Sequence, residues 1–151
     1  MLAAARSSFD QDGFLIPITF LLLPTGDVAV MSPEALKIPF TEKGKDFFAS
    51  LIRMFIQQRD VQAVIQIYET WEADGDEALA WKEVHGSLED YPNKQESLLA
   101  LLEIRQPLSQ HFWRARISRQ GSQKPVTGVF TRLLNTTSSG RFCGWFGYGS
   151  N

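Results

Sequence analysis

Six side chains of this 151-residue chain have the chemical types needed for acid–base or metal chemistry, namely Glu69, His85, Asp90, Glu96, Glu103 and His111. Two carboxylates in different environments can divide the roles of general acid and general base, and histidine with carboxylates can hold a divalent ion. None of the six stands in a diagnostic spacing: the sequence has no HExxH or GxSxG motif and no glycine loop that could cradle a phosphate. The sequence therefore assigns no catalytic residue, no metal ligand and no cofactor, and a carboxylate-dependent hydrolase is the last of three hypotheses.

Glu69 is the most informative of these carboxylates because of the strand that carries it. In VQAVIQIYETW, residues 61–71, alternation places Glu69 on the same face as Ile67 and Trp71. A single unassisted carboxylate is a weak signal of chemistry. We interpret Glu69 as a strand-end residue that leaves the core or pairs with an arginine such as Arg105 or Arg114. We interpret Glu69, Glu96 and Glu103 as structural carboxylates, with a role in a site as the alternative.

The two histidines and the single cysteine are isolated in the sequence. His85 and His111 are lone residues, and a lone histidine is usually a structural or surface side chain. Cys143 stands close to Phe142 and Trp145 and is interpreted as a small packed side chain. One cysteine cannot form an internal disulfide, which fits a reducing cytoplasm.

A second hypothesis depends on the basic segment HFWRARISR, residues 111–119. As a strand, this segment would present arginines and an aromatic ring on one face, where they could bind phosphates and stack bases. The sequence pI of about 5.7 is on the wrong side for a nucleic-acid-binding domain. An anion-binding or nucleic-acid-binding sheet is therefore the alternative hypothesis, and its candidate residues are Arg105, Phe112, Arg114 and Arg116.

The distribution of charge along the chain is uneven. All 17 acidic residues and eight basic residues lie in 1–103, which gives that part a net charge of −9, whereas 104–151 has seven basic residues and no acidic one. Residues 69–90 hold eight of the acidic residues against Lys82 alone. Short sheet connections make such neighbouring segments meet, so we expect the acidic excursion to neutralise the basic strands within the fold or between subunits.

The elements that would position these residues begin with a hairpin and a helix. An apolar run over 14–24 and a short strand through 28–31 flank a turn built from Pro24, Thr25, Gly26 and Asp27. The run is shorter than the ~20 residues that span a bilayer, so we interpret it as a buried strand and expect no membrane association. Residues 41–60 then have helical spacing, with Thr41 as the predicted N-cap. The apolar stripe of this helix is predicted to hold Phe47, Leu51 and Phe55, with Phe48, Ile52 and Ile56 beside it.

Strands are predicted after this helix. Residues 61–68 alternate, with Val61, Ala63, Ile65 and Ile67 on a core face and a semi-polar face opposite. A short helix around ALAWKEV is expected inside the acidic excursion. Residues 96–106 have high helix propensity, but the alternating segments that follow favour a strand. Further strands are predicted at 111–119 and within PVTGVFTRL, and a last one within RFCGWFGYG.

The order of these features resembles a group of uncharacterised small bacterial and phage proteins. The features are a helix, a strand ending in Glu69-Thr70-Trp71, a polar loop with Pro92 and Lys94, and a strand opening at Glu96. The resemblance covers 46–104. It implies an antiparallel sheet with a helix, supports a strand over 96–106, and implies no activity.

Taken together, the sequence predicts one α+β domain over 1–151, with residues 1–12 open to disorder. We expect an antiparallel sheet, one long amphipathic helix packed on it, and the acidic excursion between strands. The surplus of aromatic residues near the C-terminus and the apolar character of 97–104 favour an interaction surface. The favoured function is therefore a non-catalytic interaction or structural protein in the cytoplasm, expected to form a homo-oligomer and able to take an unknown protein partner.

Overall fold

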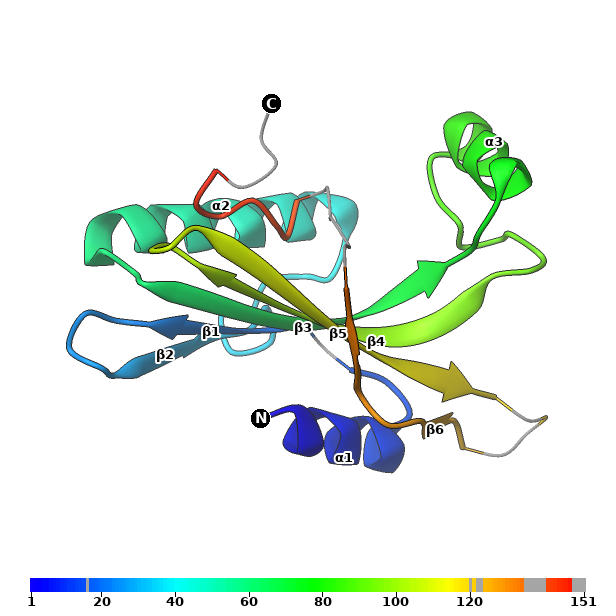
Figure 1. Cartoon of the computed structure of the whole chain (residues 1–151), viewed down its shortest axis with the longest axis horizontal. Helices are drawn as coiled ribbons and strands as arrows, with labels where there is room; N and C mark the ends of the chain where they lie inside the picture. Colours follow the sequence, from blue (N-terminus) through cyan, green and yellow to red (C-terminus); the bar gives the residue numbers. More distant parts are fainter. Residues whose placement is uncertain (16, 120, 122–123, 135–140, 148–151) are drawn as a thin grey trace. The chain divides into compact units, whose positions relative to one another are not determined.

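The computed structural model of the chain describes residues 1–15, 17–119, 121, 124–134 and 141–147. The predicted α+β class is confirmed, because helices accompany an antiparallel sheet (Figure 1). The sheet order is β2-β1-β3-β4-β5-β6, and β7 pairs with β5. In the described part of the chain, no helix is long and apolar enough to cross a membrane. The elements are α1 (Leu2–Asp12), β1 (Ile18–Leu22), β2 (Val28–Met31), α2 (Glu42–Arg59), β3 (Ala63–Glu72), α3 (Asp76–His85), β4 (Gln95–Ile104), β5 (Ser109–Ser118), β6 (Val126–Thr127) and β7 (Thr131–Leu133).

The chain divides into two compact units, each assembled from three separate stretches of sequence. Unit 1 comprises Met1–Leu15, Glu69–Leu99 and Arg114–Thr131. Unit 2 comprises Ile16–Tyr68, Ala100–Trp113 and Arg132–Asn151. The strands β3, β4 and β5 therefore each contribute residues to both units.

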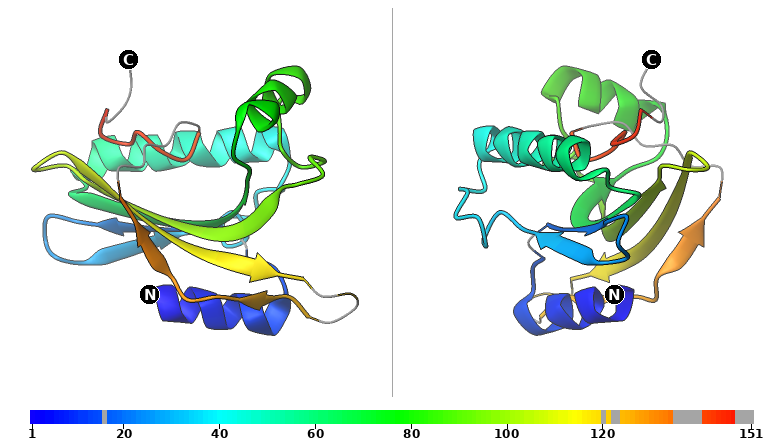
Figure 2. Two further views of the ribbon diagram at one scale, coloured as in Figure 1. Left: turned by 45° about the vertical axis from the view of Figure 1, so that its right-hand side comes forward. Right: turned by 90° about the vertical axis from the view of Figure 1, so that its left-hand side faces the viewer.

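Unit 2 is organised around the β1–β2 hairpin and α2. The hairpin turns at the predicted residues, and Leu23 N–H donates to Asp27 O at 2.9 Å. The helix begins after Thr41, whose hydroxyl accepts a hydrogen bond from Gly44 N–H at 3.1 Å, so the predicted N-cap is confirmed. Figures 1 and 2 show α2 running along one face of the unit 2 strands.

The stripe of α2 that packs in the core is not the stripe that was predicted to be apolar and buried. Phe48, Ile52 and Ile56 are buried, and they pack with Leu21 and Val64 of the sheet. The remaining predicted stripe lies further out: Phe47 is 56% exposed, and Leu51 and Phe55 are only partly buried. The periodicity identified two adjacent stripes correctly, but the second of them is the more deeply buried.

The face of β3 that contacts α2 is not the one predicted to form the core, although Val61 and Ile67 from the predicted core side are buried. The face toward α2 carries Val64 and Gln66, which are completely buried, whereas Ala63 and Ile65 on the other face are only partly buried. The prediction that Ala63 and Ile65 share the core face is therefore wrong. Ile67 is buried, as predicted, although it has the same parity as Ile65.

The later strands agree with the sequence in position and differ from it at the end of the chain. Residues 95–104 form β4 despite their helix propensity, so the strand prediction is confirmed. The segment PVTGVFTRL is split between β6 and β7. The last predicted strand is wrong for its described part, because residues 141–147 form turns. The remainder of that segment and the loop at 135–140 lie outside the described residues.

The other two helices, α1 and α3, belong to unit 1. Residues 2–12 form α1, which buries Ala5 and Phe9 and lies beside β6 (Figure 1). Asp10 accepts hydrogen bonds from both the N–H and the hydroxyl of Thr127, at 2.9 and 2.8 Å. The short helix predicted in the acidic excursion is confirmed as α3, in which Ala78 is buried.

Candidate functional site

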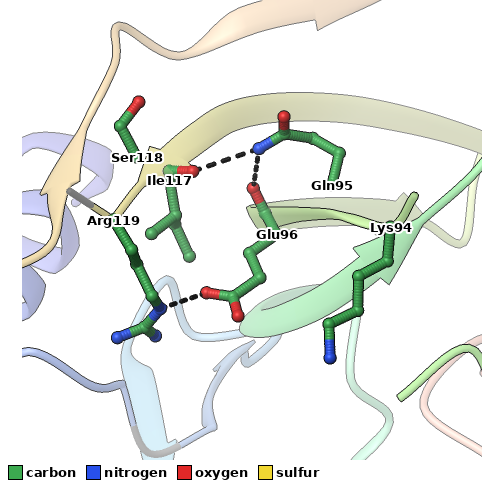
Figure 3. A pocket seen from close by; sticks show the side chains of 6 residues that line it. All are labelled: Lys94, Gln95, Glu96, Ile117, Ser118 and Arg119. Atoms are coloured by element: carbon green, nitrogen blue, oxygen red, sulfur yellow. Dashed lines mark hydrogen bonds and ion pairs between the residues drawn. The ribbon is translucent and has the colours of Figure 1, made fainter. Parts of the chain in front are cut away.

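Unit 1 has an open cleft of about 400 Å³ between the ends of β4 and β5. Figure 3 shows the Glu96 carboxylate between two cations, Arg119 and Lys94. Arg119 Nε donates to Glu96, and Gln95 Nε2 donates to the main-chain oxygens of Glu96 and Ile117 at 2.8 and 3.1 Å. The lining residues are Lys94, Gln95, Glu96, Ile117, Ser118 and Arg119. Because Glu96 offsets a neighbouring cation, the cleft offers little net charge to an anion.

Glu69 lies close enough to this cleft to feel its charges. Burial raises the pKa of Glu69, the hydrogen bond from Leu15 N–H and the charge of Arg119 lower it, and the charge of Glu96 raises it. The structure thus brings Glu69 and Glu96 into each other's field. The predicted pairing of Glu69 with Arg105 or Arg114 is wrong, since those arginines have other partners. Glu69 instead binds the chain just before β1, as expected of a residue that leaves the core.

Glu103 is a structural carboxylate in unit 2. It is fully buried and accepts hydrogen bonds from Gly144 N–H at 2.6 Å and Trp145 N–H at 2.9 Å. Burial raises the pKa of Glu103, and these N–H groups partly offset that effect. Both donors belong to residues 141–147, so Glu103 anchors that segment to β4. Its carboxylate is satisfied by the chain itself and has no access to a substrate.

The residues predicted to form an anion-binding face are not assembled into one. Phe112 is buried. Arg105 pairs with Asp60, and Arg114 pairs with Glu72 at 3.4 Å. Arg116 is exposed and has no ion pair among the described residues. The buried residues of β5 change parity from Phe112 to Ala115 and Ile117, so the face predicted from strict alternation is not continuous.

The charge split is largely neutralised within each unit. Four of the seven basic residues after Glu103 pair with carboxylates: Arg105 with Asp60, Arg114 with Glu72, Arg119 with Glu96, and Arg141 with Glu42 and Asp46. Only Glu72 among these carboxylates comes from the acidic excursion. The predicted neutralisation by the acidic excursion is therefore seen only at Glu72, and the other pairs use acidic residues outside 69–90.

The histidines and the cysteine occupy ordinary structural positions. His85 stacks on Trp81 with ring centroids 4.0 Å apart, and His111 Nδ1 lies 2.8 Å from an Arg132 nitrogen. Cys143 is buried. In the part of the chain that the structure describes, no three His, Cys, Asp or Glu side chains are grouped to hold a metal ion.

The surface that the sequence analysis missed is the face of β2, β1 and β3 opposite α2, here called the open face. Val28 and Val30 of β2 lie beside Leu22 and Phe20 of β1, and these lie beside Ala63 and Ile65 of β3. All six side chains share one face because paired residues of an antiparallel sheet point the same way. Exposure is greatest at the edge strand: Leu22 is 38% exposed, Val28 51% and Val30 59%.

The opposite, covered face is more polar than the open face. Thr19 and Gln66 are register partners that are completely buried on the covered side, and their side-chain polar atoms have no hydrogen-bond partner. The sequence contained a signal of this inversion, because ITFLL, VAVM and AVIQI are apolar at both parities. Such strands indicate a sheet with two apolar faces.

The edge of β2 adds backbone groups to the open face. In the described chain, β2 pairs only with β1 and lies at the end of the sheet. Residues 28–31 include no proline and no charged residue, which are the features that usually protect an edge strand. This edge and the three exposed aliphatic residues beside it form the candidate site.

No match to the chain was found among protein-family models, curated proteins or solved structures. The function is therefore inferred from the geometry of the described residues.

Proposed function

We propose that the protein is a non-catalytic interaction protein that self-associates through β2 and the open face of unit 2. The observation that carries this proposal is the inversion of polarity across the sheet. An isolated antiparallel sheet places its apolar face inward and its polar face toward water. Here the inward face includes Thr19 and Gln66, while Val28 and Val30 are exposed on the outward face. A second copy of the chain paired along β2 would lie beside these valines and reduce their exposure to water.

The partner is a second copy because the surface is uncharged and capable of matching itself. Six aliphatic or aromatic side chains form the open face, so two copies can meet without burying an unpaired charge. Twofold assembly, in which the same patch is used by both subunits, is the commonest arrangement of soluble oligomers.

The two other functions have weaker support. The arginines needed for a polyanion surface are largely engaged, since Arg105 and Arg114 pair with Asp60 and Glu72. The carboxylates that come together near the unit 1 cleft, Glu69 and Glu96, are held by Leu15 N–H and Arg119. Neither arrangement presents a group poised for binding or catalysis.

Native mass spectrometry and sedimentation velocity of the full chain test the proposal. We expect a dimer whose population rises with protein concentration, and we expect Val30→Lys to shift the equilibrium to monomer by placing a charge in the interface. Val84→Lys is the matched control, because Val84 is 78% exposed on α3 in unit 1. A wild-type chain that stays monomeric at every concentration would exclude self-association, and a dimer that both lysine variants weaken equally would exclude the open face as its interface.

A further inference from the structure

We infer that two copies join by antiparallel pairing of their β2 strands, with Ala29 opposite Ala29 of the second copy and Val28 opposite Val30. This inference rests on the proposed function and specifies its partner and register. A continuous sheet would then run through both subunits across a twofold axis at Ala29.

The first support is the direction of the β2 backbone groups. In an antiparallel pair, successive residues point their N–H and C=O groups alternately to the two sides of the strand. Asp27 O accepts from Leu23 N–H, so Asp27 faces β1, and Ala29 and Met31 do so by alternation. On the other side of β1, Leu22 O accepts from Gln62 N–H, which agrees with this alternation. The N–H and C=O groups of Val28 and Val30 are consequently the ones that point away from the sheet.

The second support is that the neighbouring residues limit the register. Ser32 O already accepts from Leu36 N–H, and Gly26 N–H already donates to Leu23 O. A register that paired Val30 with Val30 would require Ser32 opposite Val28, and one that paired Val28 with Val28 would require Gly26 opposite Val30. Pairing Val28 with Val30 uses all the outward groups of both residues and needs neither Ser32 nor Gly26. It forms four backbone hydrogen bonds between the subunits.

The third support is that the outward backbone groups and the most exposed apolar side chains belong to the same two residues. Val28 and Val30 lie on the open face, so each would contact its partner's valine laterally. In this register Asp27 lies opposite Met31 of the second copy, and no like charges face each other. Electrostatic repulsion therefore does not oppose the pairing.

The size of the contact predicts how tightly the subunits bind. Stable complexes typically bury about 800 Å² on each partner. A junction of four residues on each side supplies only part of such an area, even with Leu22 and Phe20 next to it. We therefore expect a reversible dimer whose subunits exchange freely.

A charge-pairing experiment tests the opposed positions. In one variant Val28 and Val30 are both changed to lysine, and in another both are changed to glutamate. Each variant alone should be monomeric, because like charges would face each other, whereas an equimolar mixture should recover a dimer of mixed mass. The control is Leu79→Lys with Val84→Lys, two exposed positions on α3 that should leave the dimer unchanged. Thermal unfolding of every variant establishes that it is folded.

Cysteine substitution tests the register. Ala29 lies on the proposed axis as a pair without direct hydrogen bonds, for which Cα atoms lie about 4.5 Å apart, within the range that a disulfide spans. With oxidised glutathione as the oxidant, Ala29→Cys should give a covalent dimer. Wild-type protein should give none, because Cys143 is buried, and Val30→Cys should give none, because it faces Val28.

The outcomes separate this inference from the proposed function. Recovery of the mixed dimer together with crosslinking through Ala29→Cys supports both. If the dimer persists when both valines are changed to lysine, or if Val30→Cys crosslinks and Ala29→Cys does not, the register is overturned and self-association stands. A chain that is monomeric at all concentrations overturns both.

Discussion

Glu103 and Trp145, 42 residues apart in the sequence, are joined by a hydrogen bond in which the Trp145 N–H donates to the buried carboxylate at 2.9 Å. Gly144 N–H donates to the other oxygen of the same group. The contact fixes the end of the described chain to β4. It also places the ring of Trp145 in the unit 2 core, where Arg53 stacks over it at 4.8 Å.

Removing the Glu103 carboxylate should destabilise the protein strongly. Glu103→Ala leaves two N–H groups without their acceptor, and each buried donor that loses its partner costs about 1–3 kcal/mol. Glu103→Gln retains one acceptor oxygen, so it should cost less than the alanine substitution. Urea unfolding measures both losses. A change below about 0.5 kcal/mol for Glu103→Ala would mean that water replaces the carboxylate without penalty.

The stability difference between the wild type and Glu103→Gln should depend on pH. Burial raises the pKa of Glu103 in the folded chain above the ordinary glutamate value of about 4.3. The folded state then binds the proton more tightly than the unfolded state, so this contribution is fully present below the unfolded pKa and is lost as pH rises through the folded pKa. Denaturant unfolding from neutral to mildly acidic pH should show the wild type gaining relative to Glu103→Gln. A constant difference would contradict the assignment.

The buried stripe of α2 predicts unequal effects of truncation. Ile52→Ala should cost about 2–5 kcal/mol, because Ile52 is completely buried against the sheet. Phe47→Ala should cost well under half of that, since Phe47 is mostly exposed. Equal losses in equilibrium unfolding would show that both stripes are covered in solution.

Reversing the charge of Arg114 should cost more than reversing that of Arg116. Arg114 lies 3.4 Å from Glu72, which also accepts a hydrogen bond from Ser97 at 2.8 Å. Arg114→Glu would place two carboxylates together, and we expect a loss of roughly 1 kcal/mol, as for other partly exposed pairs. Arg116→Glu should be nearly neutral. The prediction fails if thermal unfolding ranks the two variants the other way.

Gly44 should not tolerate a side chain. A Cβ atom at this position would lie 1.8 Å from the Pro39 carbonyl oxygen, so Gly44→Ala must displace the connector before α2. Gly128→Ala is the control, because its added Cβ would lie at an ordinary 3.6 Å from Arg116 O. We expect a clear loss of melting temperature for Gly44→Ala alone, and equal melting temperatures would contradict the close approach.

Local signals in the sequence were sufficient to place most elements. The N-cap at Thr41 and the turn at 24–27 depend on short-range hydrogen bonding, and both occur as predicted. The alternating segments that follow favour a strand at 96–106 against its helix propensity, and residues 95–104 do pair in the sheet. These features depend on neighbours in sequence, which a single chain displays.

The partners of individual side chains could not be read in the same way. Periodicity shows which residues share a face, but both faces of β3 are apolar, so it could not show which face α2 covers. The sequence also gave no reason to assign a particular carboxylate to Arg105 or Arg114. In the fold, Arg105 pairs with Asp60 and Arg114 pairs with Glu72. The candidate site was missed for a related reason, because an unpaired edge is defined only when the order of strands is known.

The anchoring of residues 141–147 by Glu103 also bears on how the chain is made. During translation, β1, β2 and α2 are synthesised well before Trp145, although Trp145 packs in the same core. Until then the Glu103 carboxylate is hydrated, and the Phe48 ring lacks its edge contact with Phe142. We therefore expect unit 2 to complete its folding only after residue 147 has left the exit tunnel. Meanwhile, its apolar strands are exposed in the nascent chain and require protection from premature association.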